Sequence, residues 1–338
     1  MKRFFWLTIL LLTAGVLFAA TSSEWTLRNP QVVPTRRSFH ALAYDSVRAN
    51  AVLFGGFGLP PTLGCCFSDT WTWDGTAWTQ RFPAHSPSLR YNHSMVFDEA
   101  RGEVVLFGGF QTTGSVFLND TWVWNGTDWT QKSPATSPSA RDSFGLVYDA
   151  ARQEVVLFGG GNGPKNDTWV WNGTNWSQKF PAANPPVRYN HAMAYDSQRS
   201  ETVLYGGFKD NNATDMYADT WVWNGTNWAQ KSPGAAPPAR VGSGTVYSDL
   251  LQGVVLFGGS EQTGGAPAAR NDTWLWNGTT WSLLSPTVKP ATTHFSRLIS
   301  HTPRKEILSI SDALSFVNSN TDTWIFRQRP RGLQNTSD

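Results

Sequence analysis

Short apolar segments separated by turn residues make up most of the chain. One unit contains SMVFD (94–98), EVVLFGG (103–109), DTWVWN (120–125) and DWTQ (128–131). The first two segments are rich in apolar and β-branched residues and the third alternates, which is typical of β-strands. Asn125-Gly126 separates the last two segments, and this pair favours a type I′ turn because both central residues need positive φ. The pattern predicts a four-stranded antiparallel sheet, whose strands we name a to d in chain order.

The unit repeats along the chain. Its tryptophan-rich segment begins at an aspartate with a period of 47 to 53 residues: Asp69, Asp120, Asp167, Asp219, Asp272 and Asp322. Seventeen of the 18 tryptophans lie within these repeats. Self-similarity at this period indicates an array of structural units, each too small to bury its apolar faces alone.

Both faces of each predicted sheet are apolar. In strand c, Trp122 and Trp124 point to one face and Val123 to the other, because side chains alternate along a strand. A radial arrangement, in which every sheet packs against two neighbours, covers both faces. We therefore predict an all-β propeller in which the paired tryptophans pack between blades. The alternative is that they form an exposed surface on which sugars stack.

The spacing from strand d to the next unit predicts the number of blades. An arginine follows the strand-d tryptophan by twelve residues in four units: Trp78 and Arg90, Trp129 and Arg141, Trp176 and Arg188, Trp228 and Arg240. Trp25 precedes Arg37 by the same twelve residues, although no strands a to c precede it, and the sixth unit lacks strand d. The segment EWTLR (24–28) is therefore predicted to complete blade six. This closes a six-bladed ring and removes the open sheet edge.

Five glycine pairs complete a pattern that resembles the Kelch repeat. Each pair follows an apolar strand and precedes the tryptophan segment: Gly55-Gly56, Gly108-Gly109, Gly159-Gly160, Gly206-Gly207 and Gly258-Gly259. The resemblance covers residues 23–327, but blade six has Ser311-Asp312 instead of glycines. It implies the β-propeller fold shared with the central domain of galactose oxidase. The family ranges from partner-binding proteins to enzymes, so the fold alone does not define an activity.

The N-terminal segment has the layout of a secretory signal peptide. Lys2 and Arg3 precede an apolar run from Phe4 to Phe18, and small residues follow. The run is shorter than the roughly 20 apolar residues of a membrane span, although an uncleaved anchor is the alternative. We predict a signal peptide at residues 1–22, a propeller at 23–327 and a C-terminal tail at 328–338. The protein is expected to be secreted or periplasmic.

Charge and cysteine content narrow the class of partner. Without Lys2 and Arg3, the chain has 25 basic and 25 acidic residues. This balance argues against nucleic acid, and no polybasic segment indicates a membrane surface. Cys65 and Cys66 are adjacent, which is too close for an ordinary disulfide. We expect a monomer whose core is held together without a disulfide framework.

Candidate ligand-binding residues lie on the face that carries the b–c and d–a connections. The b–c connections vary from six to twelve residues, and variable loops on a rigid scaffold are where binding usually resides. An arginine begins strand a in five units: Arg37, Arg90, Arg141, Arg188 and Arg240. These arginines offer bidentate contacts to a carboxylate or another anion. The alternative, favoured by the repetition itself, is that each pairs with a repeat aspartate or a loop carbonyl.

Histidines and acids add weaker candidates. His40, His93 and His191 follow the arginines by three residues, and they bind a metal only if they converge. Copper chemistry of the galactose oxidase type requires a Tyr–Cys crosslink, and the two cysteines have no neighbouring tyrosine motif. Glu261, with Asp210 and Asp215, lies in the b–c connections, which is a weak basis for hydrolysis. We predict no catalytic residue, no metal and no cofactor.

The expected function is therefore a binding or scaffold module that recognises a protein or a glycan through the b–c and d–a face. The alternative is a carbohydrate-active Kelch enzyme, such as a periplasmic sialic-acid mutarotase, which the resemblance suggests through its polar pocket.

Overall fold

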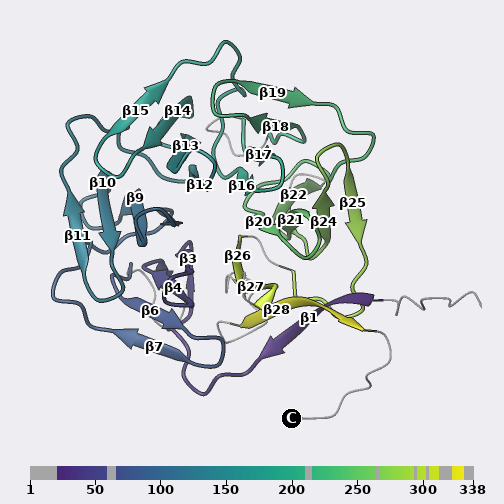
Figure 1. Ribbon diagram of the computed structural model, residues 1–338, viewed down its shortest axis with the longest axis horizontal. Coiled ribbons are helices and arrows are strands. Elements are labelled where there is room, and N and C mark those ends of the chain that lie inside the picture. The colour runs from purple at the N-terminus through teal and green to yellow at the C-terminus, as the bar shows by residue number, and fades with distance from the viewer. Residues whose placement is uncertain are drawn as a thin grey trace, which may run out of the picture.

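Six antiparallel sheets of four strands surround a central axis (Figure 1). The computed structural model describes residues 21–58, 66–209, 215–263, 266–292, 295–301, 304–311 and 322–330. Within these ranges the chain forms strands and turns and no α-helix. Strand a of each blade lies next to the axis and strand d lies at the outer edge. The prediction of an all-β, six-bladed propeller is confirmed.

The strands of the blades follow the repeat. Blade one contains β3 (Ala41–Asp45), β4 (Asn50–Phe54), β6 (Thr70–Trp73) and β7 (Trp78–Arg81). Blade two contains β8 (Ser94–Asp98), β9 (Glu103–Gln111), β10 (Val116–Trp124) and β11 (Trp129–Lys132). Blade three contains β12 (Gly145–Asp149), β13 (Glu154–Gly160), β14 (Lys165–Trp171) and β15 (Trp176–Lys179). Blade four contains β16 (Ala192–Asp196), β17 (Glu201–Tyr205), β18 (Thr220–Trp223) and β19 (Trp228–Lys231). Blade five contains β20 (Gly244–Ser248), β21 (Gly253–Phe257), β24 (Thr273–Trp276) and β25 (Trp281–Leu284).

Blade six joins the two ends of the described chain. It consists of β26 (Ser296–His301), β27 (Glu306–Ser311), β28 (Thr323–Pro330) and β1 (Thr21–Arg28). Strand β1 pairs antiparallel with β28, with Trp25 opposite Phe326, and the purple and yellow strands lie side by side in Figure 1. Trp25 is 1% exposed. The two strands extend to Thr21 and Pro330, beyond the expected propeller boundaries at residues 23 and 327.

A ring of tryptophan-to-threonine hydrogen bonds joins all six blades. The indole Nε1 of each strand-d tryptophan donates to the threonine of the DTW segment in the preceding blade, over 2.9–3.3 Å. The pairs are Trp78–Thr323, Trp129–Thr70, Trp176–Thr121, Trp228–Thr168, Trp281–Thr220 and Trp25–Thr273. These buried bonds explain why threonine follows the repeat aspartate.

The hydrophobic core lies between the blades. One cluster packs Val52 and Phe54 of blade one against Met95, Phe97 and Trp129 of blade two. The second tryptophan of each WxW segment in blades one to five is 0–3% exposed, and its ring lies 5.4–5.5 Å from that of the strand-d tryptophan in the same blade. The expected packing role of these tryptophans therefore matches the structure.

Arginines of the a–b turns join neighbouring blades on the face of the propeller opposite the b–c and d–a connections. Arg101 donates to Asp98 Oδ2 in its own turn over 2.7 Å. It also donates to two carbonyl oxygens of blade three, that of Gln153 over 3.2 Å and that of Asn172. Arg152 makes the equivalent contacts with blade four. The uniform DEAR-like turns are therefore joints between blades.

Several b–c connections contain strands where the sequence suggested loops. Strands β9 and β10 of blade two continue past the glycine pair, with Phe117 opposite Phe110. In blade one, β5 (Phe57–Gly58) pairs with β2 (Arg37–Ser38), and in blade five β22 (Ser260–Thr263) pairs with β23 (Ala266–Ala269). Strand b runs through the glycine pair in blades two and three, whereas β4, β17 and β21 end just before it. Both glycines of each pair have positive φ, as at Gly108 (60°) and Gly109 (101°), which glycine adopts without strain.

Candidate functional site

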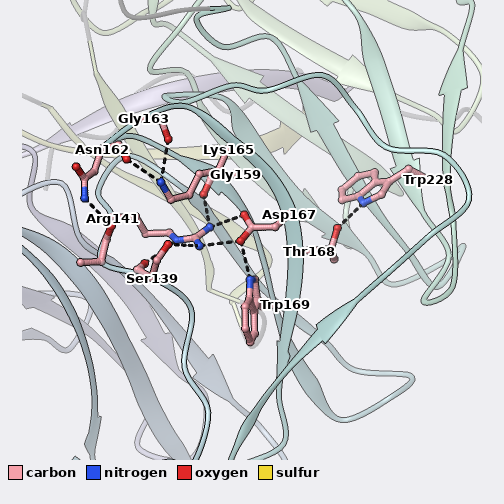
Figure 2. Close-up of polar contacts among 11 residues, drawn as sticks. Ser139, Arg141, Gly159, Asn162, Gly163, Lys165, Asp167, Thr168, Trp169 and Trp228 are labelled. Carbon is pink, nitrogen blue, oxygen red and sulfur yellow. Dashed lines mark hydrogen bonds and ion pairs between the residues drawn. The ribbon is translucent and has the colours of Figure 1, made fainter.

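The five arginines at the start of strand a are buried ion-pair partners. Arg141 donates from Nη1 and Nη2 to the two carboxylate oxygens of Asp167, over 2.6 and 2.8 Å (Figure 2). Nη1 also donates to the Gly159 carbonyl over 2.9 Å, and Nε donates to the Ser139 carbonyl over 3.0 Å. The same arrangement recurs with Asp69, Asp120, Asp219 and Asp272, and all five arginines are 0–1% exposed.

This geometry matches the pairing interpretation of the arginines. The carboxylate that an external anion would supply is the aspartate of the same blade, and it accepts a further bond from tryptophan Nε1, as from Trp169 over 2.7 Å (Figure 2). The arginine thus connects the d–a connection, the glycine bend and the start of strand c. We therefore assign a structural role to the five arginines, each of which holds the segments of its own blade together: Arg37, Arg90, Arg141, Arg188 and Arg240.

The pKa of each repeat aspartate depends on burial and on its hydrogen-bond and ion-pair partners. Burial opposes ionisation of Asp167, but hydrogen bonds and charge from Arg141, with the Trp169 bond, hold its pKa below the usual value. The pKa values of Asp69, Asp120 and Asp272 are lowered in the same way. Asp322 in blade six is the contrast, because burial raises its pKa.

The three candidate histidines lie at blade interfaces and are 0%, 0% and 8% exposed for His40, His93 and His191. The ring of His93 packs edge-on against Phe54 at 5.6 Å, and His191 packs in the same way against Phe158. Blade three uses Phe144 at this position, 5.5 Å from Phe107. The position is therefore an aromatic contact with the preceding blade. No group of three metal-ligating side chains occurs among the described residues.

We expect the double variant His93→Phe/His191→Phe to make the protein less sensitive to acid. Burial and the charge of Arg188 lower the pKa of His191 to about 3, and burial followed by Arg90 lowers that of His93 well below 6.5. Below pH 6.5 the unfolded chain therefore binds protons that the folded chain does not, and each such histidine removes about 1.4 kcal/mol of stability per pH unit. Phenylalanine cannot titrate.

The measurement is urea unfolding of wild type and double variant at several pH values from 7 to 4.5. The reciprocal variant Phe144→His is the control and is expected to steepen the loss of stability on acidification. Parallel pH profiles for all three proteins would contradict this account.

The acidic candidates are dispersed. Glu261 lies in β22, is 8% exposed, and forms an ion pair with Arg270 of the same hairpin connection. Asp215 pairs with Lys209 over 2.9 Å at the surface. Cys66 is a buried free thiol whose Sγ lies 3.3 Å from Thr112 Oγ1. The candidates Cys65 and Asp210, residues 1–20 of the predicted signal peptide and residues 331–338 of the predicted tail lie outside the described residues.

Along the axis, the described residues line two cavities that share a waist of side chains. The loop-side cavity, at the start of the a strands, has a volume of about 120 Å³ and is lined by polar residues, glycines and apolar residues. The turn-side cavity, at the a–b turns, has a volume of about 370 Å³ and is lined by Tyr44, Tyr148, Tyr195 and Tyr247 among others. One side chain per blade borders both cavities and forms the waist: Leu42, Met95, Leu146, Met193, Thr245 and Leu298.

A chain of backbone hydrogen bonds surrounds the loop-side cavity. Each residue two positions after the ring arginine donates its N–H to the equivalent carbonyl of the preceding blade over 2.8–2.9 Å, from Asn92 to Phe39, Ser143 to Asn92, Asn190 to Ser143 and Gly242 to Asn190. These residues have φ between 53° and 67°. Left-handed backbone at non-glycine residues is costly and persists where the surroundings impose it. The blades are thus joined next to the cavity as well as at the outer edge.

An aromatic row covers part of the loop face. Its six half-buried rings come from blades six, one and two: Phe295, Phe39, Tyr91, Phe57, Phe110 and Phe117. Neighbouring rings are 4.7–6.0 Å apart between centroids. Tyr91 is the centre of the row because it contacts Phe39, Phe57 and Phe110. In blade three, Asp142 and Gly161 take the places of Tyr91 and Phe110, so the row ends there.

Comparison with known proteins agrees with the repeat and the fold. Residues 13–177 match the family model described as the KLHDC2/KLHL20/DRC7 Kelch-repeats domain. The matched segment consists of Kelch repeats, and the described chain as a whole forms a six-bladed β-propeller. A solved structure described as "Structure of YjhT" is similar with a TM-score of 0.57 and 15% identity, over 74% of this chain and 84% of that chain. At this identity the similarity concerns the fold. None of the curated proteins compared with the chain matches it.

A Kelch propeller is in general a binding or scaffold module, and its surface carries the specificity. The described part of this one contains no helix with the length and hydropathy of a membrane span.

Proposed function

We propose that the protein is an exported binding module that recognises a protein partner through its loop face. The observation that carries this proposal is the aromatic row. Six half-buried rings in continuous contact form an apolar surface on a rigid scaffold, and such surfaces are typical of interaction sites. Tyrosine and phenylalanine are also enriched in the cores of protein interfaces.

The geometry of the row favours a protein over a glycan. The ring planes of neighbouring pairs make angles of 42–70°. The surface is therefore ridged, whereas a sugar stacks on an open, flat ring face. A ridged apolar surface suits interdigitating side chains of a partner. The export part of the proposal rests on the apolar run at residues 4–18 with its basic start.

We expect the double variant Tyr91→Ser/Phe110→Ser to lose partner binding while remaining folded. It removes the central ring and the ring between Tyr91 and Phe117, and both side chains lie on the surface of the scaffold. Immobilised wild type and variant are incubated with proteins from the envelope of the producing organism, and captured proteins are compared by mass spectrometry. Unchanged thermal unfolding shows that the variant is folded.

The matched control is Phe82→Ser/Phe180→Ser, which removes two rings that are 85% and 84% exposed and lie outside the row. A partner held by wild type and the control but lost from the row variant supports the proposal. Equal capture by all three proteins, or loss in the control alone, would contradict it. Binding of glycans and of no protein would make the row a lectin site instead.

A further inference from the structure

We propose that the turn-side cavity binds a small apolar amine, with the apolar part of the ligand inside the cavity and its ammonium group at the rim beside Glu99 and Asp249. The cavity lies at the a–b turns, on the face of the propeller opposite the aromatic row, so the inference goes beyond the proposed function. Three features of the cavity point to this ligand: an apolar interior, an aromatic wall and an acidic rim.

The interior of the cavity is apolar. Its floor is the waist described above, in which five of the six side chains are leucine or methionine. The next residue of each strand a also lines the cavity, and all six are aliphatic: Ala43, Val96, Val147, Ala194, Val246 and Ile299. The volume of about 370 Å³ lies within the range of roughly 300–1,000 Å³ that is typical of small-molecule sites. The cavity therefore has room for an aromatic ring with a short chain.

Aromatic side chains form the wall between the floor and the rim. They line the cavity from equivalent positions of blades one to five: Tyr44, Phe97, Tyr148, Tyr195 and Tyr247. The Tyr148 hydroxyl accepts a hydrogen bond from the Ala100 N–H of the preceding blade over 3.1 Å. The Tyr195 hydroxyl accepts from the Ala151 N–H in the same way, also over 3.1 Å. The wall is thus preorganised, and its rings are of the kind that contacts both apolar groups and organic cations favourably.

The second residue of each a–b turn forms the rim. In blades one to five this residue is exposed and lines the cavity: Ser46, Glu99, Ala150, Ser197 and Asp249. Three of these residues are small, so Glu99 and Asp249 are departures from the repeat. They belong to blades two and five, which lie on opposite sides of the ring (Figure 1). A ligand at the rim therefore has a carboxylate on either side.

The negative charge of the rim is not balanced by nearby cations. Among the described residues that line the cavity, Glu99 and Asp249 are the charged side chains, and neither forms an ion pair with another described residue. The buried aspartate that begins a turn is paired with the turn arginine, as Asp98 is with Arg101. Arg101 extends away from the axis to the Asn172 carbonyl at the c–d turn of blade three. The turn arginines thus leave the rim acidic.

The polarity of the cavity sets the orientation of the ligand. An apolar group gains free energy when it leaves water for the floor, whereas an ammonium group there loses its hydration. At the rim the ammonium group stays hydrated and is attracted by both carboxylates. A lysine side chain of a partner protein enters with its ammonium group first and has the opposite polarity, so the cavity favours a free amine.

The probes are three ligands of similar shape and different charge: phenethylamine, phenethyl alcohol and phenylacetate. Their binding to the purified protein at pH 7 is measured through the NMR relaxation of the ring-proton signals of the ligand. We expect phenethylamine to bind about threefold more tightly than phenethyl alcohol, which is the scale of exposed ion pairs. Phenylacetate is expected to bind most weakly, because the rim repels its charge. The methylamide of Nα-acetyl-lysine represents a partner's lysine and is expected not to bind.

The variant Glu99→Gln/Asp249→Asn tests the role of the rim charge. It is expected to lower the affinity for phenethylamine to that for phenethyl alcohol and to leave the affinity for the alcohol unchanged. Both side chains are exposed, so we expect the fold to be retained. The matched control, Asp128→Asn/Asp215→Asn, removes two carboxylates that lie outside the cavity and is expected to change neither affinity.

The variant Ala150→Trp tests the place of binding independently of charge. It keeps both carboxylates but adds a bulky ring at the rim, and it is expected to exclude phenethylamine and phenethyl alcohol alike. Equal binding of the amine and the alcohol to wild type, equal amine binding by the carboxamide variant and its control, undiminished binding to Ala150→Trp, binding of the lysine derivative, or no binding of phenethylamine would overturn the proposal. None of these variants removes a ring of the aromatic row, so loss of partner capture in the earlier experiment is scored independently.

Discussion

Removal of β1 is expected to lower the melting temperature by about 10 °C or more. A chain that starts at Asn29 lacks Trp25, which is 1% exposed and packs between Phe257 and Phe326 at centroid distances of 4.8 and 5.1 Å. Loss of one buried tryptophan costs about 3–5 kcal/mol, and 1 kcal/mol corresponds to about 2–4 °C in a domain of 150–250 residues. The deletion also exposes the edge of β28 along its whole length, which favours association between chains.

The matched control is a chain that starts at Thr21 and keeps β1 intact. The variant Trp25→Phe separates two contributions, because it retains an aromatic ring but removes the hydrogen bond to Thr273. Differential scanning calorimetry of the four proteins is expected to rank them as wild type and the Thr21 chain first, then Trp25→Phe, then the Asn29 chain. Equal melting temperatures for the two shortened chains would show that β1 does not close the ring.

Much of this architecture follows from local chemistry repeated at a constant spacing. The Asn-Gly turns and the alternating WxW segments are short-range patterns that correspond to turns and strands within one blade, and the interval of twelve residues after Trp25 matches the constant connection from one blade to the next. Closure by Trp25 was predictable because an isolated strand d has only one vacant place in a ring. The Trp–Thr bonds were not predicted, since they depend on how neighbouring blades are staggered.

The turn-side cavity is not predictable from the sequence, for a different reason. The five repeated arginines are candidate ligand groups in the sequence, but their repetition favours pairing within each blade, and the structure has an ion pair at each of these positions. The informative signal is the opposite one, a residue that departs from its equivalents. The second position of the a–b turns has Glu99 and Asp249 where blades one, three and four have serine or alanine. These turns look uniform in the sequence, and only the structure shows that this position faces the axis.

The b–c connections show the limit of reading glycine pairs as strand ends. Gly109 follows an apolar run with β-branched residues, which predicts the end of strand b there, whereas β9 continues to Gln111. A Cβ atom on Gly109 would lie 2.8 Å from His93 Cβ and 2.9 Å from the Tyr91 carbonyl. The glycine is thus required by its positive φ and by close contact with the segment that precedes strand a, and not by the end of a strand. The hairpin that continues beyond it carries Phe110 and Phe117 to the loop face.

Loss of a single ring arginine is expected to destabilise the fold strongly. Arg141→Met leaves Asp167, which is 22% exposed, with Trp169 as a neutral donor in place of the bidentate arginine. Removing one partner of a buried ion pair typically costs about 3–5 kcal/mol, because the other charge stays desolvated. Asp322 shows the expected consequence for acidity, since burial raises its pKa where blade six has no arginine at the equivalent position, residue 293.

The pH dependence of the free energy of unfolding shows whether the unpaired charge of Asp167 causes the loss of stability in Arg141→Met. In wild type the pKa of Asp167 is below its usual value, so its stabilising contribution is present above pH 4 and is lost as pH falls through that lowered pKa. In Arg141→Met we expect a raised pKa, so protonation relieves the variant first, and the stability difference from wild type shrinks as pH falls through that raised pKa. Urea unfolding of both proteins at pH 7 and pH 3.5 measures this difference, and the histidine contributions cancel because they are common to both.

The double variant Arg141→Met/Asp167→Leu has no stranded charge and is expected to recover part of the loss at pH 7. If it is no more stable than the single variant, the arginine stabilises the blade through the Gly159 and Ser139 carbonyls, and the ion pair itself contributes little.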